Sequence, residues 1–181
     1  EDAGLIAGPA DLDRLSAQNA GGVTCVPAFA GLGAPFWRPE ATASFTGLTL
    51  ATHREHLVIS VLEGLAAQIA ELVDSTARDL GQRLTRLRVD GGLTKSMRLM
   101  QVLADVAQVC VEVYPTSDAT PLGAAALARM ALDPTLGADE AIGPWQPSAI
   151  FEPAWSQDQA GTFRAGWNQA LNATLADQGK A

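Results

Sequence analysis

Apolar residues change their spacing several times along the chain, and each change marks an expected element. The segment 53–80 has apolar residues on several helical faces, and Glu63 is the only ionisable side chain between His56 and Glu71. This pattern predicts a long helix that is buried on more than one side, with Gly81 at its C-terminal end.

Strands and helices alternate after this long helix. Two apolar segments, 84–89 and 109–114, have the length and composition of strands, and a segment with helical spacing follows each of them. Such alternation indicates an α/β fold, which we expect to be a mixed sheet flanked by helices. The other expected elements are a short N-terminal helix beginning near Pro9, strands at 23–29 and 43–49 on either side of a structured loop at 30–40, and helices at 94–108 and 120–132.

The C-terminal quarter of the chain differs in composition from the rest. Residues 134–181 hold four of the ten prolines and three of the four tryptophans, and they include an amphipathic stretch at about 156–177. We therefore expect one domain over residues 1–133, with residues 134–181 as a helical appendage packed on that same domain.

Composition and charge narrow the functional classes. The 181 residues are 48% hydrophobic and 18% charged, with a formal net charge of −8. We expect such an acidic globular chain neither to bind nucleic acid non-specifically nor to anchor on an anionic membrane. No unbroken apolar stretch approaches the ~18 residues of a membrane span. The isolated cysteines, Cys25 and Cys110, lie in apolar segments, which indicates buried thiols and a reducing, cytoplasmic location.

The turn Asp90-Gly91-Gly92 is the first candidate site. It lies between an expected strand and an expected helix, which is where α/β proteins place ligands. Glycines let a ligand approach the backbone closely, and a helix starting at Thr94 would offer its amides and positive dipole end to an anion. The same glycines also fit a purely structural turn, and no P-loop or GxGxxG motif is present. Five of the twelve basic residues lie close by: Arg83, Arg86, Arg88, Lys95 and Arg98.

Other reactive side chains give weaker signals. His53 and His56 lie three residues apart at the start of the long helix, but no cysteine or carboxylate set completes a metal site, so we expect a polar helix entry. Neither cysteine lies in a nucleophile motif. Glu63 is expected to bond a neighbouring strand or loop, because an unpaired buried carboxylate is costly, and the alternative is a catalytic base.

Several segments of the chain resemble the FGGY family of carbohydrate kinases, and they are most similar to the glycerol kinases of that family. The resemblance covers residues 22 to about 132, with the motifs in family order and at family spacing. It rests on the runs VPAFAGLGAPFWRPEA (26–41), ASFTGLTLATHREHLVISVLE (43–63), LRVDGGLTKSMRLMQVLADV (87–106) and ATPLGAAALA (119–128).

The resemblance implies an actin-like ATPase (ribonuclease H-like) fold and a kinase. Such a kinase transfers the γ-phosphoryl group of ATP, with Mg²⁺, to a hydroxyl of a polyol or sugar. Its catalytic aspartate would lie upstream of Glu1, so we expect this chain to be the ATP-binding C-terminal half, inactive by itself and without catalytic or metal-ligating residues. The resemblance aligns Gly91 and Gly92 with the nucleotide-binding positions, and Ser96 with a position where glycerol kinases commonly carry Asn.

Two positions depart from the glycerol kinase pattern. Ser96 is shorter than the usual Asn and has a single oxygen, which bears on the nucleotide contact. The triplet Ala41-Thr42-Ala43 stands where glycerol kinases usually have Ala-Arg-Gly, which leaves the phosphoryl acceptor undetermined. A small polyol or sugar would bind through the missing N-terminal domain, and self-association into a homo-oligomer stays open. The alternatives are a non-catalytic nucleotide- or protein-binding module of the same fold, and an unrelated α/β binding protein in which Asp90-Gly91-Gly92 is only a turn.

Overall fold

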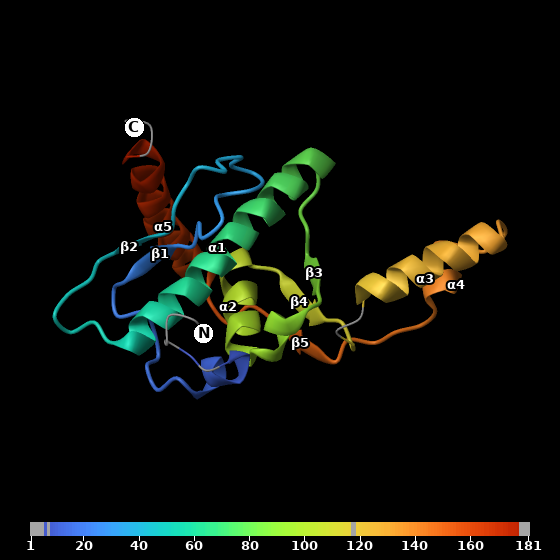
Figure 1. Cartoon of the computed structure of the whole chain (residues 1–181), viewed down its shortest axis with the longest axis horizontal. Coiled ribbons are helices and arrows are strands. Elements are labelled where there is room, and N and C mark those ends of the chain that lie inside the picture. Colours follow the sequence, from blue (N-terminus) through green and yellow to red (C-terminus); the bar gives the residue numbers. More distant parts are fainter. Residues whose placement is uncertain (1–5, 7, 117–118, 178–181) are drawn as a thin grey trace.

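The computed structural model describes residue 6 and residues 8–116 and 119–177, so the expected domain ends at 1–5 and 178–181 lie outside the described residues. Two small sheets lie among the helices of the main body (Figure 1). The elements in chain order are η1 (Pro9–Arg14), β1 (Thr24–Val26), β2 (Ser44–Thr46), α1 (Arg54–Leu80), β3 (Arg86–Val89), η2 (Gly92–Lys95), α2 (Met97–Ala107), β4 (Cys110–Val113), α3 (Ala119–Leu132), α4 (Ala138–Ile142), β5 (Ala149–Phe151) and α5 (Gln157–Asp177).

Strands β3, β4 and β5 form a mixed three-stranded sheet. β3 runs parallel to β4, with Leu87 opposite Val111, and β5 runs antiparallel to β4, with Phe151 opposite the same Val111. Helix α2 connects the two parallel strands, as parallel pairing requires a crossover. The expected mixed sheet flanked by helices is therefore confirmed, and β5 is a strand that the sequence pattern does not predict.

Strands β1 and β2 form a separate antiparallel ribbon. Both are shorter than the expected strands at 23–29 and 43–49. Pro27 follows β1 directly and has no amide hydrogen with which to extend the pairing. Gly47 follows β2 and has a φ of 76°, which turns the chain out of the strand.

Helix α1 is the centre of the core and packs against β1, α2 and α5. Its buried residues extend from Val58 to Val73. Gly64 lets the helix approach β1 closely, because a Cβ at this position would lie 2.4 Å from the carbonyl oxygen of Cys25. Leu72 is 44% exposed, so one side of α1 faces solvent although apolar residues lie on several of its faces.

The same helix also bears on the expectation that nothing in the chain spans a membrane. By length and apolar composition alone, α1 could cross a membrane, although the sequence contains no unbroken apolar stretch of that length. Half of its most apolar window is buried inside the protein, however. Together with its contacts to β1, α2 and α5, this gives α1 the packing of a core helix.

The C-terminal quarter contributes to the sheet and the core. Trp167 on α5 is 1% exposed, and its Nε1 donates a hydrogen bond of 2.9 Å to the carbonyl oxygen of Cys25. The buried Asp105 on α2 accepts hydrogen bonds from the backbone amides of Ala154 and Trp155, which fixes the connection from β5 to α5. β5 therefore extends the three-stranded sheet and α5 contacts β1, α2 and α1, while the division of the chain into a domain at 1–133 and an appendage at 134–181 stays a prediction.

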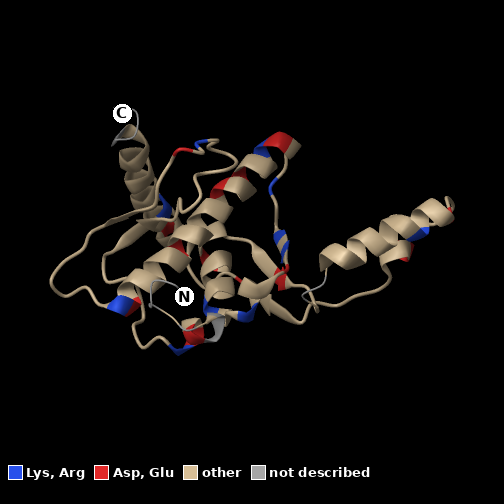
Figure 2. Ribbon diagram, viewed as in Figure 1, with Lys and Arg blue, Asp and Glu red and all other residues tan. Residues whose placement is uncertain are grey.

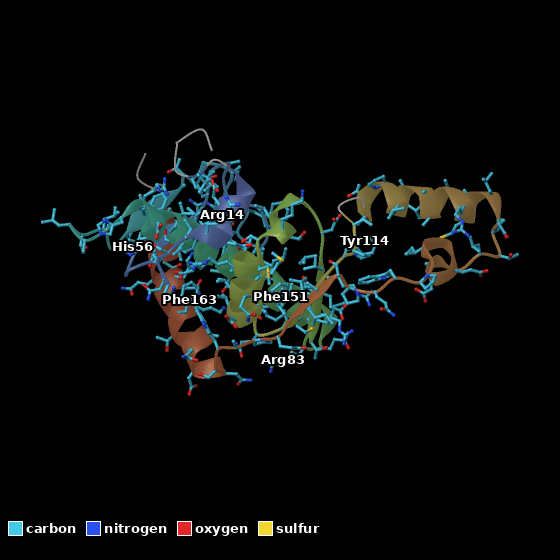
Figure 3. All side chains as sticks on the ribbon, turned by 90° about the horizontal axis from the view of Figure 1, so that it is seen from below. Arg14, His56, Arg83, Tyr114, Phe151 and Phe163 are labelled. Atoms are coloured by element: carbon cyan, nitrogen blue, oxygen red, sulfur yellow. The ribbon has the colours of Figure 1, made fainter. Side chains whose placement is uncertain are left out.

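Helices α3 and α4 project from the body as an arm (Figure 1). Of the residues described in α3, only Ala126 is buried, and Leu127 and Leu132 are largely exposed. Tyr114 lies where the arm leaves the body (Figure 3), and its ring contacts that of Trp145 at a tilt of 50°, with centroids 4.9 Å apart. The arm, rather than the C-terminal helix, is therefore the least integrated part of the fold.

Candidate functional site

The segment from Asp90 to Ser96, here called the glycine loop, joins β3 to α2. Gly91 has φ 108° and ψ 177°, a conformation that is essentially restricted to glycine. Its amide donates a 2.6 Å hydrogen bond to Oδ1 of Asp90, and its carbonyl accepts from the amide and hydroxyl of Thr94 at 3.1 and 2.7 Å. Asp90 thus shapes the turn.

The backbone of the two glycines is open to an approaching ligand. A Cβ built at Gly91 or at Gly92 would have no heavy atom within 4 Å. Nothing in the described protein therefore requires glycine at 92 for packing, and φ at 92 is not positive. Leu93 follows Gly92 in the loop, and Met97 is the first residue of α2. Their side chains are 49% and 66% exposed and add an apolar surface that sequence analysis missed.

Ser96 has a structural task in this loop. It is the N-cap of α2 and is fully buried. Its hydroxyl accepts a hydrogen bond from the amide of Leu99 at 3.2 Å and donates one to Oδ1 of Asp13 at 2.9 Å. Contact between Ser96 and a nucleotide stays a prediction, and it would require this cap to open.

Helix α2 begins at Met97, three residues later than expected, because residues Gly92–Lys95 form the 3₁₀ turn η2. Its first amides are already bonded, since Met97 and Arg98 donate to Oδ2 and Oδ1 of Asp13 at 3.1 and 3.0 Å. The expectation that this helix end is free for an anionic ligand is therefore wrong for the described structure: the carboxylate of Asp13 occupies it.

The charge of Asp13 fits its position. Burial acts to raise the pKa of Asp13, but the hydrogen bonds from Arg98, Ser96 and Met97, with the positive charge of Arg98, lower it below its usual value. Sequence analysis missed this residue because it lies more than 80 positions before its partners.

Much of the positive charge near the loop is already paired within the protein. Figure 2 shows the basic residues along β3. Arg86 and Arg88 donate to the buried carboxylate of Glu112 on β4 at 2.6 and 3.3 Å. The guanidinium of Arg98 donates to the carbonyl oxygen of Ala17 at 3.0 Å. These three arginines stabilise the fold, so the charge left for a ligand is smaller than the sequence indicates.

Comparison with known protein families shows to which family the chain belongs. The model of the FGGY family of carbohydrate kinases, C-terminal domain, matches residues 2–132, which is well over half of the chain. The chain belongs to this family.

Known relatives of this FGGY domain include glycerol kinases. It is 38% identical over 174 residues to the glycerol kinase of Mycolicibacterium vanbaalenii, covering 95% of this chain and 34% of that protein. It is 41% identical over 154 residues to the glycerol kinase of Azotobacter vinelandii, covering 85% and 30%. A crystal structure of Plasmodium falciparum glycerol kinase with ADP matches with a TM-score of 0.84 and 36% identity, covering 96% of this chain and 35% of that one.

These similarities confirm the expected actin-like ATPase fold and the kinase resemblance. The FGGY domain spans about a third of the length of the relatives that it matches.

Glu63 is a largely buried carboxyl group whose pKa is raised. Burial raises the pKa of Glu63 to about 7, against the opposing effects of a backbone hydrogen bond from Ala20 and the charge of Arg98. The expectation that it bonds a neighbouring loop is confirmed by the contact with Ala20. A role as catalytic base stays an untested alternative.

The remaining reactive side chains have structural surroundings. Nδ1 of His56 accepts a hydrogen bond from the amide of His53 at 3.1 Å, which caps α1. Burial raises the pKa of the Cys25 thiol to about 12, so this thiol is protonated at neutral pH. Within the described residues, no group of three or more His, Cys, Asp or Glu side chains could hold a metal ion.

Two hollows of the FGGY domain lie away from the glycine loop. One of about 300 Å³ lies between the ends of α1 and α2 and the start of α5, where Arg164 pairs with Glu71 and Asp74. Another, of about 540 Å³, lies between β3 and α4, where the guanidinium of Arg88 is 4.8 Å from the ring centroid of Trp145. Neither of these two hollows is lined by Gly91 or Gly92.

Proposed function

We propose that this FGGY domain is the ATP-binding C-terminal half of a kinase that transfers the γ-phosphoryl group of ATP to a hydroxyl of glycerol or of a related polyol or sugar. One observation supports this most: 36–41% identity to glycerol kinases over 85–96% of the chain. The catalytic base and most substrate contacts would come from the part of the relatives that this chain does not span.

The glycine loop is the proposed nucleotide contact. Gly91 and Gly92 leave space that a Cβ would fill, which fits a ligand lying against the backbone. The exposed Leu93 and Met97 offer an apolar surface suited to a purine ring. Ser96 supports this wall from inside, through its bonds to Asp13 and Leu99.

ATP would supply the transferred group, and Mg²⁺ would neutralise the charge that develops on the phosphates. Since the described residues contain no group that could hold a metal, we propose that Mg²⁺ is held by the phosphates and by residues outside this chain. The domain's own residues would orient the nucleotide, which is the main contribution a protein makes to phosphoryl transfer.

The buried Cys25 thiol and the half-buried, unpaired Cys110 fit a reducing compartment, and we propose a cytoplasmic location.

A chimaera tests the proposed function. The chain replaces the corresponding C-terminal third of the Mycolicibacterium vanbaalenii glycerol kinase, to which it is 38% identical. Glycerol-dependent ADP release is then measured with ATP and Mg²⁺. We expect activity from the chimaera and none from the isolated chain, because we propose that the catalytic base lies in the part of the relatives that this chain does not span.

The matched control is the same chimaera with Gly92→Val. The open space at this position should let valine fold normally, while the two added methyl groups and Cβ block approach of the nucleotide. A folded chimaera without activity would contradict the kinase proposal and favour a non-catalytic module. Polyol-dependent ADP release by the isolated chain would contradict its assignment as a half-enzyme.

A further inference from the structure

An N-terminal segment, residues 13–20, lies across the starts of α1 and α2 and is hydrogen-bonded to both helices. Glu55 near the start of α1 accepts hydrogen bonds from the hydroxyl of Ser16 and the amide of Ala17, at 2.7 and 2.8 Å. On the α2 side, the guanidinium of Arg98 donates to the carbonyl oxygen of Ala17. We call this segment the strap; Asp13 is its only residue with hydrogen bonds to the α2 backbone among the described contacts.

Three donors converge on the Asp13 carboxylate. They are the hydroxyl of Ser96 and the backbone amides of Met97 and Arg98, all within 3.1 Å. An ionised carboxylate has only acceptors and can satisfy all three, whereas an asparagine amide would turn an NH₂ group toward one of these N–H groups. The site is therefore specific for a carboxylate, and its negative charge also complements the dipole of α2.

A continuous series of hydrogen bonds leads from this carboxylate to the glycines. Ser96, which binds Asp13, also donates its amide to the carbonyl oxygen of Leu93 at 3.1 Å. Thr94 in turn donates to the carbonyl oxygen of Gly91 through both its amide and its hydroxyl. The glycine loop is thus fixed at one end by β3 and at the other by Asp13.

We propose that Asp13 is a positioning residue for the nucleotide: it sets the place of Gly91 and Gly92 by holding Ser96 and the first turn of α2. This inference rests on the proposed function for its relevance to nucleotide binding. The geometry also assigns the α2 N-terminus to this internal carboxylate rather than to a phosphate of the ligand.

The test uses the whole 181-residue chain, labelled with ¹⁵N, as Asp13→Ala and Asp13→Asn variants. Hydrogen exchange and amide chemical shifts are recorded for residues 91–96 without ligand, followed by a titration with ADP. In Asp13→Ala we expect exchange in the loop to rise roughly tenfold or more, because charge-assisted bonds are lost. Asp13→Asn, which keeps one acceptor, should give a smaller change, and ADP should bind more weakly to both variants.

Glu55→Gln is the matched control. It weakens the same strap at its α1 end and leaves the bonds to α2 in place. It should lower stability while leaving the amide shifts of Gly91 and Gly92, and the affinity for ADP, unchanged. Formate added to Asp13→Ala supplies a carboxylate for the freed donors and should return the loop shifts toward wild type, whereas chloride at equal ionic strength should not.

Unchanged loop shifts in Asp13→Ala would overturn the proposal. So would loop shifts in Glu55→Gln as large as those in Asp13→Ala, because the effect would then reflect general loss of stability. Failure of the proposed function has a different signature: the wild-type chain would not respond to ADP at the loop, while the ligand-free shifts would still report on Asp13.

Discussion

Trp167→Ala tests whether α5 is an integral part of the FGGY domain. Trp167 is among the most completely buried large side chains in the described structure, and it lies 6.4 Å from Phe36 between ring centroids. Its Nε1–H also satisfies the buried carbonyl oxygen of Cys25. The substitution removes the ring from the core and leaves that oxygen without this donor.

The expected loss follows from these contacts. Truncating a buried tryptophan to alanine costs about 3–5 kcal/mol of the free energy of unfolding. For a chain of this length, each kcal/mol lowers Tm by about 2–4 °C, so the variant should melt roughly 6–20 °C below wild type. Trp167→Phe keeps most of the packing and loses the hydrogen bond, which should cost about 1–3 kcal/mol.

Urea and thermal unfolding followed by far-UV circular dichroism measure both variants. The control is Gln169→Ala, an exposed position on the same helix, which should stay within about 0.5 kcal/mol of wild type. A loss below about 1 kcal/mol for Trp167→Ala would refute the reasoning, because α5 would then be a detachable appendage. If Trp167→Ala does not fold, the melting of Trp167→Phe decides the same question.

Two further substitutions test the loop and the core. Gly91→Ala should lower the free energy of unfolding by about 1–3 kcal/mol, because Gly91 has a backbone conformation reserved for glycine. Gly92→Ala should lower it by less than about 1 kcal/mol. Urea unfolding compares the two variants, and equal losses would contradict the φ assigned to Gly91. Glu63→Gln should remove a pH dependence of stability. Burial raises the pKa of Glu63 from 4.5 to about 7 in the folded state. Between these pH values the folded state holds a proton that the unfolded state releases. The stability of the wild type therefore falls as pH rises through this range, by up to about 3 kcal/mol. Unfolding near pH 5 and near pH 8 should therefore differ less in the variant, and an identical difference in both proteins would contradict the assignment.

Most of the α/β arrangement could be predicted from local patterns. The strong apolar periodicity of α1 and the strand–helix alternation from β3 to α3 depend on neighbouring residues, so the sequence signals them directly. β5 is different: Ala149–Phe151 is three residues long and forms a strand only because β4 offers a pairing edge. A strand so short has no period of its own to detect.

Sequence patterns predict the glycine turn of the candidate site but not the residues that hold it in place. A turn between strand and helix could be predicted from Asp90, Gly91 and Gly92 alone, since their chemistry is local, whereas the 3₁₀ turn η2 that follows was not predicted. The bonds between Asp13 and the start of α2 join residues more than 80 positions apart, and no local pattern marks them. For the same reason the arginines near the loop looked free in sequence, although Glu112 on the next strand binds two of them.

Titration of the ¹⁵N-labelled chain with ADP tests the central claim, that this FGGY domain carries one wall of a nucleotide site. With the other wall absent, binding should be worth only about 4 kcal/mol, which is a dissociation constant on the order of a millimolar. We expect amide shifts concentrated in residues 90–98 of the wild type, and their loss in Gly92→Val with an otherwise unchanged spectrum. Shifts confined to residues far from this loop, or identical shifts in Gly92→Val, would contradict the account.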